Sequence, residues 1–178
     1  MARAFTKESD NESVDDLLPE PIEVLAPGAR NYITPSGASA MREHVRTLTA
    51  QRTALLDSLR GEADPSEKKK LRELDRRIRY FEERIGGLEI VAPAAGPPMR
   101  VIFGTWVRVC DQHGACRQVQ ICGVDEADPD NGRISWISPL AKALLGRETG
   151  DEVTIELPDG SSTFEIEAIA QDVEGLDQ

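Results

Sequence analysis

The sequence has no long hydrophobic run. No apolar stretch approaches the roughly 18 residues that a membrane-spanning helix needs, and the opening residues, MARAFTKESDNES, lack the apolar centre of a secretory signal peptide. We therefore expect a cytoplasmic protein with no membrane partner. Apolar residues make up 39% and charged residues 30% of the 178 residues, a balance typical of a folded globular protein.

Cysteine is scarce, with three in the chain. An odd number without an export signal predicts reduced thiols rather than a disulfide framework. Cys110, His113, Cys116 and Cys122 lie near one another in the sequence, but their spacing contains no CxxC pair, and a strand sends alternate side chains to opposite faces. The pattern therefore does not favour a zinc site.

Basic residues are outnumbered, and the net charge of −11 is unevenly distributed. Residues 1–34 carry 7 acidic and 3 basic side chains (net −4), residues 35–86 carry 9 and 12 (net +3), and residues 87–178 carry 16 and 6 (net −10). Phosphate binding depends on clustered Lys and Arg, so an acidic body argues against direct nucleic-acid binding and favours a protein partner.

A helical hairpin is predicted over residues 34–91. Residues 1–33 are acidic and rich in proline, which predicts a flexible arm. Thr34 and Pro35 then suit an N-cap and first helical position. Two seams follow with alternating spacings of 3 and 4: Met41, Val45, Leu48, Arg52, Leu55, Leu59, and Leu71, Leu74, Ile78, Phe81, Ile85, Leu88. Paired antiparallel, they fold back near residue 65 in a coiled coil about 35–40 Å long.

A sheet domain is predicted after a Pro- and Gly-containing linker at 92–98. Short runs with a period of two, VIFGTWVRV, QVQICGV, RISWIS, VTIEL and TFEIEAIA, predict antiparallel strands joined by turns. The domain should span 99–170 and be followed by an acidic tail at 171–178. The fold class is therefore α+β.

The segment SPLAKALLG predicts one short helix in this domain, with Ser138 as N-cap, Pro139 at the first position and Gly146 as stop. The aromatic side chains on the strands are expected in the core. The alternative is an apolar pocket that they line. They are Phe103, Trp106, Trp136 and Phe164.

The predicted hairpin tip, GEADPSE, is acidic. Asp64 and Glu67 suit an N-cap and its capping-box partner, whereas Glu62 follows the helix stop Gly61 and has no capping role. The functional alternative is that tip carboxylates help to hold Mg²⁺, with the remaining ligands supplied by a partner.

The second helix is rich in basic residues, from Lys68 to Arg84. They form either a solvated face balanced by acidic neighbours or a flank that lies against an acidic groove in a partner. Arg52, the polar member of its seam, is expected to fix the register of the hairpin or to extend its charge to solvent.

Four segments together resemble the bacterial GreA/GreB transcription elongation factors, and the GreB type more closely. They are NYITPSG, LRELDRRIRYFEERI, VIFGTWVRV and ISPLAKALLGRETGDEVTIELPDG, within residues 31–170. The resemblance implies an FKBP-like C-terminal domain on the rim of the secondary channel of RNA polymerase and a coiled coil inside that channel. DNA and RNA would be met only within the elongation complex.

The resemblance also implies a mechanism. In the family, two acidic residues at the tip support a Mg²⁺ of the polymerase active site, which then cleaves backtracked RNA. The factor is itself no enzyme and has no cofactor of its own. The family's tip motif, G-D-x-x-E-N-[AS]-[DE]-Y, is absent here and the hairpin is shorter. Glu62 and Asp64 are the acidic residues nearest the matching place.

The same resemblance gives the docking surface, because SPLAKALL is the segment that matches the family best. The residues expected to contact the polymerase are Ser138, Pro139, Leu140, Ala143, Leu144 and Leu145. The altered tip slightly favours regulation by occupancy of the channel over stimulated cleavage.

Two other classes of function stay open from the sequence. One is an FKBP-like prolyl isomerase or chaperone, which needs an open aromatic pocket. The other is a dimerising coiled-coil adaptor, against which the self-paired seams predict a monomer. The acidic arm is expected to shield the basic hairpin until the polymerase is met.

Overall fold

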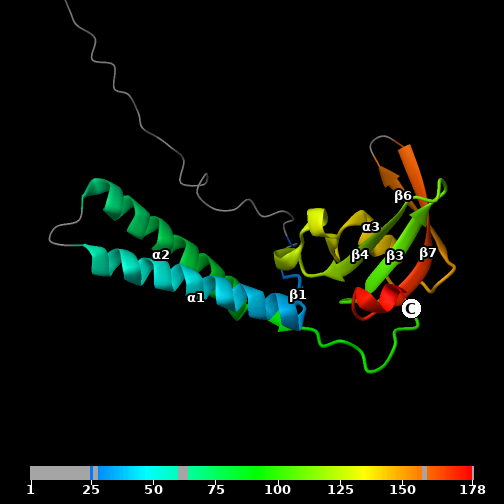
Figure 1. Ribbon diagram of the computed structural model, residues 1–178, viewed down its shortest axis with the longest axis horizontal. Helices are drawn as coiled ribbons and strands as arrows, with labels where there is room; N and C mark the ends of the chain where they lie inside the picture. The colour runs from blue at the N-terminus through cyan, green and yellow to red at the C-terminus, as the bar shows by residue number, and fades with distance from the viewer. Residues whose placement is uncertain (1–24, 26–27, 60–63, 158–159, 178) are drawn as a thin grey trace, which may run out of the picture.

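The computed structural model describes residues 25, 28–59, 64–157 and 160–177. A helical hairpin projects from a compact sheet domain (Figure 1), as predicted. The hairpin consists of α1 (Pro35–Ser58) and α2 (Pro65–Gly86). At 1.5 Å per residue, their 24 and 22 residues correspond to lengths of about 33–36 Å.

Both helices begin where the capping signals predict. The Thr34 hydroxyl accepts a hydrogen bond from the backbone N–H of Gly37 (3.0 Å). Asp64 caps α2, and each helix has a proline in its first turn. These local signals succeed because a cap needs only the three residues that follow it.

Apolar packing in the hairpin is concentrated at its base. Ile33, Ala38 and Met41 are buried there, and three partly buried residues pack against them: Phe81, Ile85 and Leu88. No residue of α2 is fully buried, and Leu56 near the far end of α1 is 41% exposed. Beyond the base, Leu48 of α1 is 2% exposed, and two seam residues near the tip, Leu55 and Leu71, are half-buried.

A small parallel sheet closes the base. Strand β1 (Asn31–Ile33) pairs in parallel with β2 (Leu88–Ile90). The predicted arm at 1–33 is therefore wrong for its last three residues, because their partner strand is brought to them only by the folded hairpin. Residues 1–24, 26 and 27 of that arm lie outside the described part of the chain.

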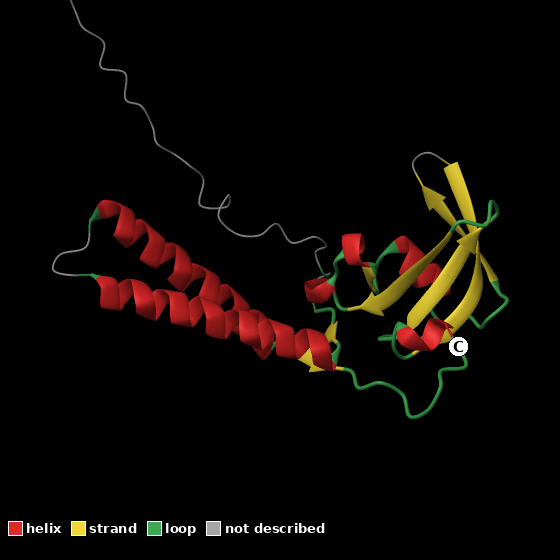
Figure 2. Cartoon of the chain, in the orientation of Figure 1, coloured by secondary structure: helices red, strands yellow, loops and turns green. Residues whose placement is uncertain are grey.

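The sheet domain contains five strands in the order β5-β4-β3-β7-β6. Figure 2 colours strands yellow and helices red. The five strands are β3 (Trp106–Asp111), β4 (Cys116–Cys122), β5 (Arg133–Ser135), β6 (Glu152–Leu157) and β7 (Gly160–Ala170). The prediction of an entirely antiparallel sheet is wrong for one pair, because β4 and β5 run parallel. Between them the chain crosses over through two 3-10 turns, η2 (Val124–Glu126) and η3 (Pro129–Asn131).

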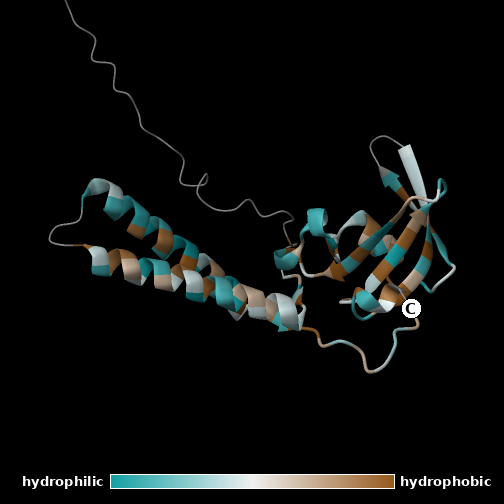
Figure 3. Cartoon of the chain, viewed as in Figure 1, coloured by the Kyte–Doolittle hydropathy of each residue, from teal (hydrophilic) through white to brown (hydrophobic). Residues whose placement is uncertain are grey.

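One short helix, α3 (Pro139–Leu144), packs against the sheet as predicted. Hydrophobic and hydrophilic residues alternate along the strands (Figure 3), and the inward members form the core with Leu140 and Leu144. The tail predicted at 171–178 includes a 3-10 turn, η4 (Glu174–Asp177), whose Leu176 is 3% exposed. Among the described helices, none combines the length and apolar character that a membrane crossing requires.

The structure contains a disulfide between Cys110 and Cys116. The prediction of reduced thiols is therefore wrong for these two residues. They lie directly opposite each other on β3 and β4, a proximity set by strand register rather than by cysteine count. Cys122 is a free, buried cysteine, and desolvation by burial raises the pKa of its thiol to about 12.

Candidate functional site

The described part of the hairpin tip is organised by Asp64. Its Oδ1 accepts hydrogen bonds from the backbone N–H groups of Ser66 (2.7 Å) and Glu67 (2.9 Å) and from the Ser66 hydroxyl (2.8 Å). Glu67 Oε2 accepts from the backbone N–H of Asp64 (2.9 Å), which completes the predicted capping box. The Glu67 N–H bond and then the Ser66 hydroxyl lower the pKa of Asp64, so its carboxylate is charged at neutral pH.

Capping leaves part of this carboxylate available. All of the hydrogen bonds above end on Oδ1, and within the described residues Oδ2 accepts none. Asp64 is exposed, so Oδ2 suits a hard cation, which takes oxygen ligands. The capping role and the ligand role of Asp64 are therefore compatible. Glu62, the other predicted tip ligand, lies outside the described residues.

Basic residues follow the tip along α2. This helix contains eight Lys and Arg and five Asp and Glu, net +3. Near the base Arg84 is bound to the sheet domain through Asp125 (2.5 Å). The exposed members are Lys68, Lys69, Lys70, Arg72 and Arg79. A positive flank therefore lies between the acidic tip and the base.

The predicted docking helix, α3, divides into buried and exposed residues. Leu140 (9% exposed) and Leu144 (0%) belong to the core of the sheet domain, so a partner could contact them only if the core opened. Ser138 is the N-cap and accepts from the N–H of Ala141 (3.2 Å). Pro139 and Lys142 are exposed, whereas the predicted contacts Ala143 and Leu145 are half-buried.

The two parts of the molecule are joined by a carboxylate that the sequence analysis missed. Glu126 Oε1 accepts hydrogen bonds from the backbone N–H groups of Thr34 (2.8 Å) and Gly123 (2.8 Å), and its Oε2 accepts from the Thr34 hydroxyl (2.6 Å). Its position requires glycine at 37, where a Cβ would lie 1.8 Å from Glu126 Oε2. In the sequence, only the glycines at 37 and 123 could have indicated this close contact between the hairpin and the sheet domain.

Neighbouring contacts strengthen this joint. Asp125 accepts a hydrogen bond from the Asn31 side chain (2.7 Å) in addition to the Arg84 ion pair. The Tyr32 ring lies 5.4 Å from that of Trp136 and 6.0 Å from that of Phe103, between centroids. Two of the aromatic residues that an isomerase pocket would use, Phe103 and Trp136, thus contact Tyr32 of β1 at the base of the hairpin. The base of the hairpin is fixed to the sheet domain.

Comparison with known proteins identifies this arrangement. Transcription elongation factor GreB of Yersinia pestis is 37% identical to the chain over 147 residues, which cover 76% of this chain and 86% of that protein. The chain belongs to the GreA/GreB family. A family model described as "Transcription elongation factor, GreA/GreB, C-term" matches residues 96–171. GreB of Haemophilus ducreyi is 34% identical over 157 residues, covering 82% and 97% of the two chains.

Solved structures of Gre-type factors also match this GreA/GreB-family chain. Gfh1 of Thermus aquaticus shows 23% identity and a TM-score of 0.38, covering 79% of this chain and 98% of that one. The GreA/GreB factor of Nitrosomonas europaea shows 20% identity and a TM-score of 0.39, and the match covers 79% of this chain and 99% of that one.

Proposed function

We propose that this transcription elongation factor binds RNA polymerase, with the hairpin in the secondary channel and the sheet domain on the channel rim. The observation that carries the proposal is an acidic tip on a long hairpin whose base is fixed to the sheet domain by Glu126 and Asp125. A fixed base is what a probe needs to place its tip at a defined depth. The positive flank of α2 suits an acidic channel wall.

We further propose that the tip supports a Mg²⁺ of the polymerase active site. Asp64 would contribute Oδ2 while its Oδ1 caps α2, and Glu62 would supply the second carboxylate. With two such ions in the polymerase active site, one would activate water and the other would stabilise the leaving oxygen of the cleaved RNA. This chain's part is to hold a charged carboxylate rigidly at the tip, so the protein assists the polymerase rather than acting as an enzyme.

A second candidate function is regulation by occupancy of the channel. The segment GEADPSE stands where the cleaving members of the family carry a longer acidic motif, and each helical turn that is lost withdraws the tip by about 5.4 Å. Metal ligation tolerates only about 0.2 Å. A shorter hairpin would then fill the channel and exclude other factors without cleavage.

Cleavage of backtracked RNA separates the two functions. We would add the protein to stalled, backtracked complexes of the cognate RNA polymerase with 3′-labelled RNA and Mg²⁺, and compare wild type with Glu62→Gln/Asp64→Asn. Asparagine is a good N-cap, so Asp64→Asn removes charge and keeps the helix start. Asp57→Asn, an exposed carboxylate near the end of α1, is the matched control.

The expected result is rapid shortening of the RNA with wild type and Asp57→Asn, lost in the double variant while binding persists. Binding without shortening by the wild type would support occupancy instead. Absence of binding by the wild type would contradict both functions.

A further inference from the structure

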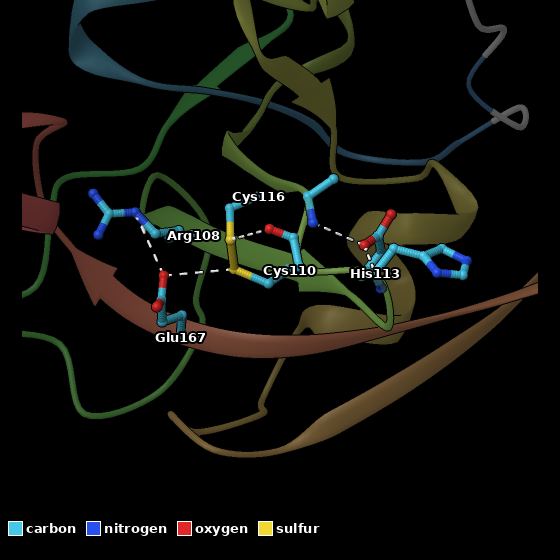
Figure 4. The surroundings of a disulfide bond; sticks show 8 residues. Arg108, Cys110, His113, Cys116 and Glu167 are labelled. Carbon is cyan, nitrogen blue, oxygen red and sulfur yellow. Dashed lines mark hydrogen bonds and ion pairs between the residues drawn. A yellow bond between two sulfur atoms is a disulfide. The ribbon is translucent and has the colours of Figure 1, made fainter.

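The disulfide lies beside a carboxylate from a third strand. This disulfide joins Cys110 on β3 to Cys116 on β4 next to the turn that connects these two strands. Glu167 on β7 approaches the disulfide from the other side of β3 (Figure 4). One ligand atom of each lies within 4.8 Å of the others. Cys116 and Glu167 are exposed and Cys110 is half-buried, so ions and reductants can reach the cluster.

A β-bulge places the carboxylate there. Arg108 pairs with Ala168 but its neighbour Val109 pairs with Ile166, so Glu167 is an extra residue in β7. Bulges redirect side chains and are common beside functional sites. Glu167 Oε2 lies 3.5 Å from Cys110 Sγ, yet a disulfide sulfur carries no hydrogen to donate. The contact therefore suits a reduced Cys110 or a shared cation better than the disulfide.

We propose that Cys110, Cys116 and Glu167 form a redox-gated site for a thiophilic divalent cation such as Zn²⁺. In the reduced protein the two thiolates and the carboxylate are three ligands, and water takes the open fourth position of a tetrahedral ion. In the oxidised protein the sulfur–sulfur bond removes two ligands and closes the site. Nothing in this proposal depends on the binding of RNA polymerase.

The chemistry balances with a dithiol as reductant. The dithiol transfers two electrons and two protons, the Cys110–Cys116 bond breaks to give two thiols, and the dithiol becomes a disulfide. Cation binding then releases the two thiol protons to solvent, because thiolates are the ligands.

The net charge of the cluster would be the same in the disulfide state and in the cation-bound state. Arg108 Nε lies 3.8 Å from Glu167 Oε2, so one positive and one negative group flank the disulfide. Reduction and deprotonation add two negative charges, and a divalent cation offsets both. Without the cation, two thiolates beside a carboxylate would repel one another. A divalent cation thus favours the reduced, deprotonated form.

Cys122 and His113, the other candidate ligands in this stretch of the sequence, do not belong to the proposed site. The Cys122 thiol is buried and donates to the carbonyl of Ile134 (3.4 Å). The His113 ring points away from the sulfur atoms, and its backbone N–H donates to Asp111 Oδ1 (Figure 4). Sequence spacing alone did not favour this site because Glu167, its third ligand, lies 51 residues after Cys116.

Cadmium binding tests the proposal in the full-length protein. Cd²⁺ added to protein reduced with a phosphine should give thiolate-to-metal charge-transfer absorption that saturates at one ion per chain, with Zn²⁺ competing. Cys110→Ser and Cys116→Ser should abolish this absorption, and Glu167→Gln should weaken binding by about tenfold or more. Protein oxidised to the disulfide should bind no Cd²⁺.

Two variants serve as matched controls. Cys122→Ser removes the remaining thiol, and Glu165→Gln makes the same charge change on β7 at the residue directly opposite Cys110. Both should bind Cd²⁺ like wild type, with circular dichroism verifying the fold of every variant. The proposal is overturned if reduced wild type binds no more Cd²⁺ than Cys110→Ser/Cys116→Ser, or if Glu165→Gln weakens binding as much as Glu167→Gln.

Discussion

At the scale of single residues, Glu126 joins the base of the hairpin to the sheet domain. Its carboxylate satisfies the backbone N–H groups of Thr34 and Gly123, both of which are buried. A buried donor left unsatisfied costs about 1–3 kcal/mol. We therefore expect Glu126→Ala to lower the free energy of unfolding by about 2–5 kcal/mol, measured by urea denaturation.

Glu126→Gln is the matched variant. Its amide oxygen can accept from both N–H groups, and its NH₂ can donate to the Thr34 hydroxyl, which gives up its bond to Glu126 Oε2 and donates to Ser36 instead. The loss should be below about 1 kcal/mol. If Glu126→Ala were as mild as Glu126→Gln, the joint would not depend on these hydrogen bonds.

Asp64 gives a prediction about pH. Hydrogen bonds from the Glu67 N–H and the Ser66 hydroxyl favour its charged form and lower its pKa in the folded state below the ordinary 3.8. The stability that this carboxylate contributes is therefore present above 3.8 and is lost as pH falls through the lower folded value. A ¹³C-detected NMR titration should place the Asp64 midpoint below 3.8, and Ser66→Ala should raise it. A midpoint at or above 3.8 would contradict the capping geometry.

The residues that the sequence predicts well are those with local partners. Thr34, Asp64 and Ser138 act on N–H groups two or three positions away, so a short segment contains the whole interaction. Glu126 and Glu167 act on residues distant in the sequence, and no local pattern distinguishes them from other surface carboxylates.

At the scale of elements, an ion pair between Arg52 of α1 and Asp75 of α2 connects the two helices of the hairpin near their middle. This contact supports the predicted role of Arg52 in register. The two side chains are 40% and 44% exposed, so a double-mutant cycle with alanine should give a coupling energy of only about 0.2–1 kcal/mol, reduced at high salt. The same double-mutant cycle on the Glu43–Arg46 pair, which lies within α1, is the control. A coupling above this range that is insensitive to salt would require a buried contact.

One substitution in helix α3 should affect binding to RNA polymerase, and another should affect the stability of the protein. Lys142 is exposed, so Lys142→Glu should weaken binding to RNA polymerase while changing the free energy of unfolding by less than about 1 kcal/mol. Leu144 is 0% exposed, so Leu144→Ala should destabilise the protein by about 2–5 kcal/mol, and its folded fraction should bind like wild type. Unchanged polymerase affinity in Lys142→Glu would exclude α3 from the contact.

The elements that sequence analysis missed depend on long-range pairing. Strands β1 and β2 have three residues each, too few to show a period of two. The parallel pairing of β5 follows from the crossover through η2 and η3. The long seams were predictable because their periodicity extends over 19 residues from Met41 to Leu59 and over 18 residues from Leu71 to Leu88.

For the whole molecule, the charge distribution predicts how it meets its partner. Residues 1–24 contain 7 acidic and 2 basic side chains, net −5, and precede the helix of net charge +3. An extended chain of that length reaches up to about 80 Å, farther than α2 is long. The arm can therefore compete with an acidic partner for the basic flank.

Deletion of residues 1–24 should speed association with RNA polymerase at low salt and leave it unchanged at high salt, because screening shortens charge interactions to about 10 Å at 0.1 M. The deletion should end before Arg30, which pairs with Glu89 (3.0 Å), and β1. A full-length variant with the seven acidic residues changed to Asn or Gln is the matched control, since it keeps chain length. Rapid-mixing kinetics should show both variants associating faster than wild type. Equal rates for all three at low salt would show that the arm does not shield the hairpin.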